Sequence, residues 1–179
     1  FGMSTMSGSV SALKENPQFI DMLTKFSNPI IGIIVGMLFT CVLQSASASI
    51  GILQSLAVTG AVSFATALPL TMGIGIGAAL PVLLSSLGAT TAGKRTAVVY
   101  LVIDVLGAII CGVVFYAADA AVGFSFMGSS MTMVSIALMN TVYRLVIVIV
   151  LFPMIGLLER LTEFIVREKP VSEDDDDAV

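Results

Sequence analysis

The longest stretch without a charged residue runs from Phe26 to Gly93, and it contains no Asp, Glu, Lys or Arg. The whole chain has no His, 57% of its 179 residues are hydrophobic, and its mean hydropathy is +1.05. A soluble fold would have to expose part of such a tract to water, so this composition is typical of membrane proteins. We therefore predict an all-α polytopic membrane protein in the lipid bilayer of the cell membrane (inner or plasma).

The charge distribution excludes several functions. The net charge is −4, but residues 173–177 (Glu-Asp-Asp-Asp-Asp) form an acidic tail, and the remainder carries about +1. There is thus no basic surface for nucleic acid. No His, activated thiol or pair of carboxylates converges, so we expect neither an enzyme nor a bound cofactor. The two cysteines, Cys41 and Cys111, are predicted to be small buried thiols.

A polar stretch interrupts the uncharged tract at residues 44–49, which read Gln-Ser-Ala-Ser-Ala-Ser. Polar side chains at membrane depth are costly unless they pair or face a cavity, so this stretch is either a helix contact or a site for a small solute. The apolar arms on both sides are too short to span a bilayer, which takes about 20 residues. We predict a re-entrant hairpin over residues 28–62 with this polar tip. The alternative is one long helix whose serines bond back to their own carbonyls.

The next segment, residues 63–93, contains Pro69, Pro81 and the run Gly73-Ile-Gly-Ile-Gly77. Glycine and proline at this density predict a membrane helix that is broken near its middle. The alternative is an unbroken helix that uses its glycines for close packing against a neighbour.

Residues 94–156 contain two full transmembrane helices, expected over 96–117 and 131–156. Their outer ends carry Lys94, Arg95, Arg160 and Arg167. The positive-inside rule therefore makes residues 94–95 and 157–179 cytoplasmic and the loop at 118–130 external. Residues 157–179 are expected to form a cytoplasmic amphipathic helix followed by the acidic tail.

Residues 1–27 have a mixed composition. We interpret them as the end of a membrane helix followed by an interfacial amphipathic helix, with an ordinary connector as the alternative. Because the sequence begins with Phe1, we expect the chain to be a piece of a longer protein.

Two ionisable residues lie inside the predicted transmembrane hairpin. Asp104 is in its first helix and Arg144 in its second. Ionisable residues at such depth are rare and are normally paired or functional. We predict that they form a structural ion pair; the alternative is that Asp104 itself carries protons or binds Na⁺.

Several motifs together resemble one repeat of the type II sodium–phosphate cotransporter family. They are Phe1-Gly-Met-Ser-Thr-Met-Ser, Asn28-Pro29, Thr40 followed by the 44–49 stretch, Gly60-Ala-Val-Ser-Phe-Ala-Thr-Ala-Leu-Pro, and Lys94-Arg95-Thr-Ala. The resemblance covers residues 1–167. The chain resembles the second of two inverted repeats, so its fold would be one transporter repeat with re-entrant or broken helices plus two full transmembrane helices.

The resemblance implies a half-unit of a sodium-coupled secondary transporter for phosphate or a related anion, with Na⁺ as the coupling ion. The tips of two hairpins would meet near the midplane and form the site, so a second repeat is an implied partner. The substrate- or ion-binding residues carried over are Gln44, Ser45, Ser47, Ser49, Thr40, Gly73, Gly75 and Gly77. Na⁺ would be bound through Gln44, Ser45 and Ser47.

The chain departs from the family pattern at its polar positions. Ala46 replaces a serine of the hairpin motif. The glycine run lacks the Asn and two Thr of the usual Gly-x-Asn-Ile-Gly-Thr-Thr. Asp104 and Arg144 stand where the family carries Asn. The alternative function is therefore a diverged, non-transporting repeat with a structural or regulatory role in the membrane.

Overall fold

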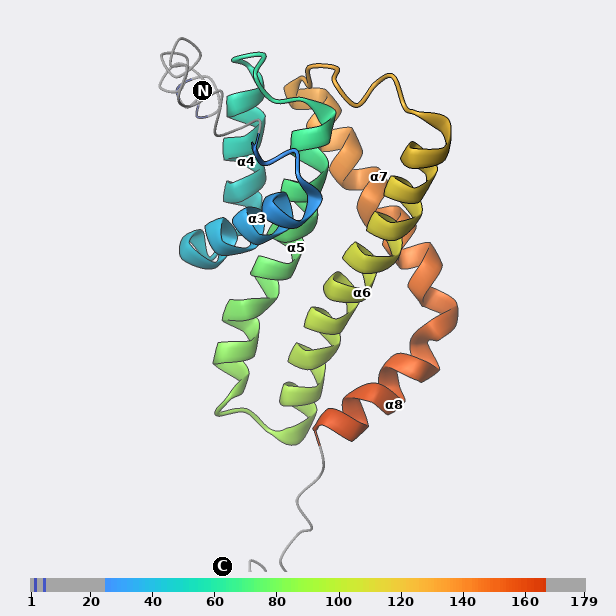
Figure 1. The fold of residues 1–179 in the computed structure, drawn as a ribbon. Coiled ribbons are helices and arrows are strands. Elements are labelled where there is room, and N and C mark those ends of the chain that lie inside the picture. Colours follow the sequence, from blue (N-terminus) through green and yellow to red (C-terminus); the bar gives the residue numbers. More distant parts are fainter. Residues whose placement is uncertain (1, 3–4, 6–24, 167–179) are drawn as a thin grey trace, which may run out of the picture.

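The structure is a computed structural model, and it describes residues 2, 5 and 25–166 (Figure 1). Within these residues the regular secondary structure is helical, which confirms the all-α prediction. The expected interfacial helix before residue 25 lies outside the described residues. The helices are α3 (Pro29–Leu43), α4 (Ala46–Ala57), α5 (Phe64–Ser86), α6 (Thr91–Val122), α7 (Met133–Leu151), the short 3₁₀ helix η2 (Phe152–Met154) and α8 (Ile155–Ile165).

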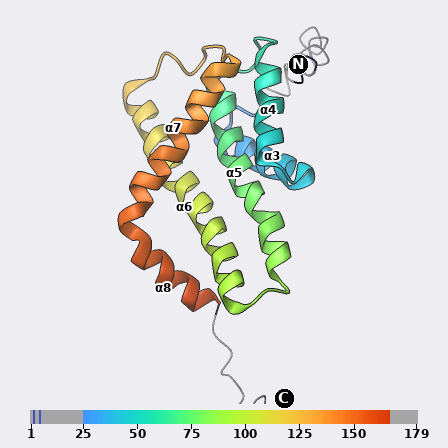
Figure 2. The same ribbon diagram turned by 180° about the vertical axis from the view of Figure 1, so that it is seen from behind.

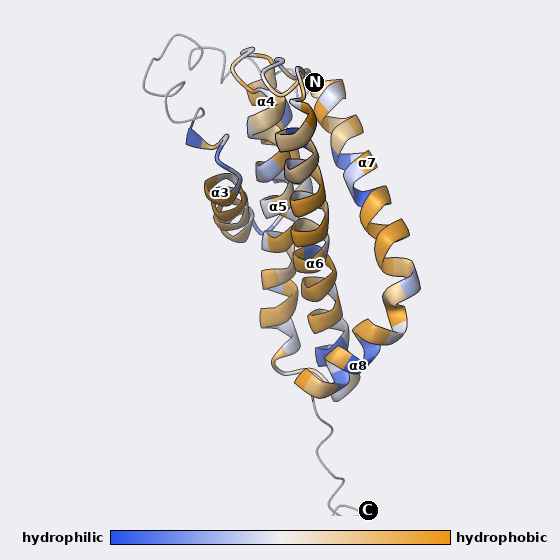
Figure 3. Ribbon diagram, turned by 45° about the vertical axis from the view of Figure 1, so that its right-hand side comes forward, coloured by the Kyte–Doolittle hydropathy of each residue, from blue (hydrophilic) through white to orange (hydrophobic). Residues whose placement is uncertain are grey.

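Three helical segments are long and apolar enough to cross a membrane, namely Phe64–Ser86, Thr91–Val122 and Met133–Ile165. The first of these is the centre of the bundle, because 61% of its apolar window is buried, against 17% for the second. Figure 3 shows apolar residues along most of α5, α6 and α7, with hydrophilic residues gathered on α8 beside the start of α6. The apolar outer faces of α6 and α7 are those expected of lipid-facing helices.

The two short helices α3 and α4 form a hairpin whose arms emerge at the same end of the bundle. Just before α3, the Ser27 hydroxyl lies 3.0 Å from the Thr66 hydroxyl in the first turn of α5. After α4, the Ser130 hydroxyl donates to the Gly60 carbonyl at 3.1 Å. The turn between the arms lies about halfway along α5 (Figure 1). The hairpin therefore packs on the outer side of α5, with α3 crossing α5 obliquely and the turn at about half the depth of the bundle (Figure 3).

The alternative of one long helix through residues 44–49 is excluded by the backbone. Gln44 has φ 54°, in the left-handed region, and its N–H bonds to the Thr40 carbonyl as a helix C-cap. Ser45 is extended and its hydroxyl accepts from the Ala48 N–H, which makes it the N-cap of α4. Two capping residues in succession end one helix and begin the next.

The predicted break within residues 63–93 is wrong, because α5 is one uninterrupted helix that includes Pro69 and Pro81. Each proline removes one ladder hydrogen bond, and a neighbouring helix can stabilise the rest. Here α3 packs directly against the glycines: a Cβ added at Gly73 would overlap the Ile33 carbonyl oxygen, and one at Gly77 would lie 2.5 Å from the Met37 carbonyl oxygen. The glycines serve close packing, which was the alternative interpretation of the run.

The α6–α7 hairpin is connected by residues 123–132, at the end of the bundle where α4 also emerges. There the Met131 N–H bonds to the Val62 carbonyl at 2.8 Å. At the opposite end, η2 bends the chain and α8 runs back towards the start of α6 (Figure 2). The Arg95 Nε donates to the Val166 carbonyl at 3.2 Å, and its guanidinium lies 3.9 Å from Glu163. The amphipathic helix α8 is thus held by its C-terminal end against the start of α6.

Candidate functional site

The polar side chains predicted to bind substrate lie in the hairpin tip (residues 44–49) and, for Thr40, in the last turn of α3. They fall into two groups. Thr40 and Ser49 are fully buried, and the Thr40 hydroxyl donates to the Ser49 hydroxyl at 3.0 Å. The Ser49 hydroxyl in turn donates to the Ser45 carbonyl at 2.9 Å. This chain of hydrogen bonds ties the last turn of α3 to the first turn of α4, so it fixes the shape of the tip.

The second group points outward. The Gln44 and Ser47 side chains are exposed, and Ser45 is half-buried. Among the described residues, no hydrogen bond occupies the Gln44 amide or the Ser47 hydroxyl, so their hydrogen-bonding capacity is available to a solute or a partner. Ala46 brings no hydroxyl to this surface.

Two helix ends meet at the tip. The first N–H groups of α4 have no intrahelical acceptor, and the last carbonyls of α3 have no intrahelical donor. The partial positive charge of the α4 N-terminus favours an anion, and the carbonyls at the α3 C-terminus favour a cation. The tip therefore offers groups for both kinds of ion without a charged side chain.

The glycine run is placed differently from the tip. Since α5 is continuous, the N–H and carbonyl groups of Gly73 and Gly75 belong to its helical ladder rather than to an opened backbone. The Gly77 carbonyl is the exception, because its ladder donor would be residue 81, and Pro81 has no N–H. Gly73 and Gly77 lie against α3, and a Cβ at Gly77 would be 2.9 Å from the Thr40 Cβ. These two glycines therefore place the hairpin tip at mid-depth. Gly75 faces elsewhere.

The predicted ion pair between Asp104 and Arg144 is present. An Arg144 Nη1 hydrogen bonds to Asp104 Oδ1, joining α7 to α6. The Asp104 side chain is 2% exposed and that of Arg144 36%. A Cβ at Gly75 would lie 2.9 Å from Arg144 Nη2, so the absence of a side chain on α5 makes room for the guanidinium.

The ion pair and the hairpin tip lie on opposite faces of α5. Residues two apart in an α-helix point about 200° apart, so Gly75 faces away from Gly73 and Gly77. Gly75 faces Arg144 and Asp104, whereas Gly73 and Gly77 face α3. The body of α5 consequently separates the Asp104–Arg144 pair from the hairpin tip. The pair and the tip do not form one site within this chain.

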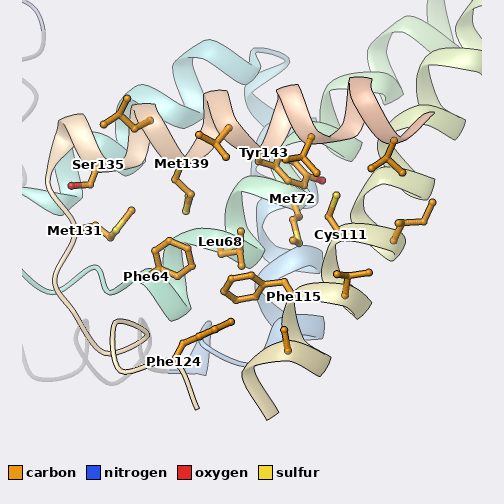
Figure 4. A pocket seen from close by; sticks show the side chains of 17 residues that line it. Phe64, Leu68, Met72, Cys111, Phe115, Phe124, Met131, Ser135, Met139 and Tyr143 are labelled. Carbon is orange, nitrogen blue, oxygen red and sulfur yellow. The ribbon is translucent and has the colours of Figure 1, made fainter. Parts of the chain in front are cut away.

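An apolar cavity lies away from the hairpin tip (Figure 4). It has a volume of about 710 Å³ and lies between α5, α6 and α7. Figure 4 shows Phe64, Leu68, Met72 and Phe115 pointing into it. Apart from Ser135, Tyr143 and Cys111, its lining side chains are apolar, and none is charged. A lining of this kind suits hydrocarbon and offers almost nothing to an inorganic ion.

Sequence reasoning missed two glycines that help to form the site. Gly32 and Gly36 of α3 are buried, and a Cβ at Gly32 would lie 2.7 Å from the Pro69 Cβ. With Gly73 and Gly77 they let the two backbones approach closely. The signal was present in the sequence, because small residues four apart mark helix contacts in membranes.

Taken together, three apolar spanning helices, a half-depth hairpin and a polar tip without charged side chains define a polytopic membrane protein of the transporter kind. Residues 1–141 match the sequence model of the Na⁺/Pi-cotransporter family, and the chain belongs to that family. This is a family of transporters rather than a class of enzymes.

A curated relative is the uncharacterised protein YqeW of Bacillus subtilis (strain 168). It is 27% identical over 137 residues, which cover 76% of this chain and 44% of the relative. The chain thus spans less than half the length of the relative. No solved structure is a significant match.

Proposed function

We propose that this chain is a half-unit of a sodium-coupled transporter for phosphate or a related anion, with its site at the hairpin tip. The observation that carries the proposal is the turn at Gln44 and Ser45, which lies halfway along α5 and brings the C-terminus of α3 next to the N-terminus of α4, each with backbone groups beyond the one that its cap satisfies. Membership of the Na⁺/Pi-cotransporter family supports the two substrates. The side chains that would bind them are the exposed Gln44 and Ser47 and the half-buried Ser45.

In a bilayer this hairpin would be re-entrant. By the positive-inside rule, Lys94 and Arg95 make the end that holds α8 cytoplasmic. Both hairpin arms and the loop at 123–132 would then lie at the external end. The tip would sit near the midplane, where secondary transporters place their substrates.

A second repeat is needed to complete the site. Non-helical backbone at membrane depth is tolerated only when protein or a water-filled cavity surrounds it. Gln44 and Ser47 are exposed in this chain, as is part of the Arg144 side chain. An inverted repeat, in the same protein or in a second copy, would cover these surfaces.

The balance of charge requires a co-transported cation. No Lys or Arg lies between residues 26 and 93, so nothing on the hairpin neutralises a phosphate. The α4 N-terminus carries only about half a positive charge. Na⁺ bound by the carbonyl end of α3 and the tip hydroxyls would supply the remainder, which makes binding of the two ions mutually dependent.

The test is uptake of labelled phosphate by the complete protein in liposomes, with an inward gradient of Na⁺ or of choline. We expect uptake with Na⁺ alone, and a marked loss in Ser45→Ala and Ser47→Ala. Ser85→Ala is the matched control, since Ser85 lies at the far end of α5 and its hydroxyl bonds only to the local Val82 carbonyl.

The alternative is a diverged repeat that does not transport, and the missing hydroxyl at Ala46 is the observation in its favour. It predicts no uptake by the native protein but uptake by a variant with Ala46→Ser, Ala78→Thr and Ala79→Thr. Gly75 is left unchanged there, because a side chain at that position would collide with Arg144. That pair of results would overturn the transport proposal.

A further inference from the structure

The Asp104 carboxylate occupies a place where an anion cannot remain alone. The residue is 1% exposed, and only its Oδ1 has a partner, which is Arg144. Its Oδ2 is buried and has no hydrogen bond within the described residues. Burying an ionised carboxylate without a compensating cation is strongly unfavourable. An ionised Asp104 therefore requires one positive charge close to its carboxylate.

The space for that positive charge is provided by Gly75. A Cβ at this position would lie 2.9 Å from Arg144 Nη2, 3.4 Å from its Cζ and 3.3 Å from Asp104 Oδ1. Gly75 on α5 and the Asp104 carboxylate on α6 thus form the walls of one small niche. The end of the Arg144 side chain enters this niche from α7. Three helices meet there around a single guanidinium.

We propose that this niche is a monovalent-cation site whose permanent occupant is the Arg144 guanidinium. The residues that form its walls include one carboxylate and no second acid, so the negative charge of the niche balances a single positive charge. Because the cation is tethered to α7, it cannot dissociate, and a dissolved Na⁺ is excluded from this face of α5. Any Na⁺ dependence of the protein would then arise elsewhere.

The inference is independent of the proposed transport function. The niche lies on the face of α5 opposite the hairpin tip, and its cation is part of the chain. Removing the guanidinium should open the niche to a dissolved cation. A small guanidinium compound matches the shape of the lost group, whereas Na⁺ would find few oxygen ligands beyond the two of Asp104. Choline is too large to enter.

The experiment measures thermal unfolding of Arg144→Ala, purified in detergent, in equal low-millimolar concentrations of choline, sodium or methylguanidinium chloride. Phosphate is omitted, and the deciding comparison is methylguanidinium against choline, neither of which is a proposed ligand of the hairpin tip, so failure of the transport proposal leaves that comparison unaffected. We expect the melting temperature to be highest in methylguanidinium. The rise over choline should be about 3–6 °C at ten times the dissociation constant, with a smaller rise in Na⁺.

Two controls make the comparison specific. The native protein should show no difference between methylguanidinium and choline, because Arg144 fills the niche; its response to Na⁺ includes the hairpin tip and is not part of the control. The double variant Asp104→Asn with Arg144→Ala should show none either, because the carboxylate is gone. An equal melting temperature of Arg144→Ala in methylguanidinium and in choline, or an equal rise with methylguanidinium in either control, would overturn the proposal.

Arg144→Ala could fail to accumulate in membranes. Recovery of folded protein is then compared with and without methylguanidinium during extraction. Recovery that depends on methylguanidinium and requires Asp104 supports the proposal. Failure with every cation, while the double variant folds, contradicts it.

Discussion

Glycines on two opposite faces of α5 let neighbouring groups approach closely, but the groups on the two faces differ in chemistry. On one face, Gly73 and Gly77 bring the backbone of α3 into direct contact, and the buried hydroxyls of Thr40 and Ser49 bond to each other and to a carbonyl. On the other face, Gly75 admits a guanidinium that pairs with a buried carboxylate. Both faces use glycine to admit a neighbour at mid-depth.

The difference lies in what each face leaves available. The ion pair neutralises itself within the chain and has a single orphan oxygen at Asp104 Oδ2. The hairpin face keeps Gln44 and Ser47 exposed, together with two helix ends. This difference supports the proposal that the hairpin binds the ligand, while the ion pair serves stability. Four comparisons between variants test this division.

The largest effect is expected from breaking the ion pair. Arg144→Asn leaves the buried Asp104 carboxylate without a counter-charge, which should cost about 3–5 kcal/mol of unfolding free energy. The double variant Asp104→Asn with Arg144→Asn should recover most of that loss. Equilibrium unfolding of the single and double variants in micelles measures it. A double variant no more stable than either single one would show that the two residues do not act as a pair.

The hairpin face should respond next most strongly. Gly73→Ala forces a methyl group into the Ile33 carbonyl of α3, and overpacking of this kind costs about 1–3 kcal/mol. The matched control is Gly51→Ala in α4, where a Cβ would meet nothing within 4 Å. That control should be as stable as the native protein or slightly more so, since Ala is the better helix former. Equal behaviour of the two variants in thermal unfolding would refute the close α3–α5 contact.

A smaller effect separates the buried hydroxyls of the hairpin tip from the exposed ones. Ser49→Ala removes the acceptor of the Thr40 hydroxyl and should cost about 1 kcal/mol of stability. Ser47→Ala should leave stability unchanged, because that side chain is exposed. Its expected effect is on phosphate uptake alone. A stability loss in Ser47→Ala equal to that in Ser49→Ala would mean that the tip is closed rather than open.

The smallest effect concerns the backbone of the turn. Gln44 adopts φ 54°, a conformation that glycine adopts without strain. Gln44→Gly should therefore keep stability within about 1 kcal/mol of the native value, and any larger defect should appear in uptake. Gln54→Gly in α4 is the contrasting control, because it loses helix propensity and the hydrogen bond to the Met133 carbonyl. If Gln44→Gly unfolds as readily as Gln54→Gly, the left-handed turn is not the feature that holds the tip.

Much of the fold follows from local patterns in the sequence. Apolar stretches of sufficient length predict α6 and α7, and the polar interruption at 44–49 predicts the turn between α3 and α4. Two opposite charges on antiparallel apolar helices predict the Asp104–Arg144 pair, since neither is tolerated alone in lipid. These features depend on length, polarity and charge, which are properties of each segment by itself.

Other features depended on contacts with neighbouring helices, which cannot be read from the sequence of the segment itself. The glycines and prolines of α5 predicted a break, but α3 packs against Gly73 and Gly77 and the helix continues. The same composition supports a broken helix or a closely packed one, and only the partner decides between them. The return of α8 to Arg95 was likewise decided by a contact between distant segments.

The sequence by itself therefore determined a membrane protein with a polar hairpin tip and a charged pair, because hydrocarbon penalises each unpaired polar group directly. The tertiary structure alone decided that tip and pair lie on opposite faces of α5. The direction of a residue around a helix has meaning only relative to the helices that surround it, and those are placed by packing.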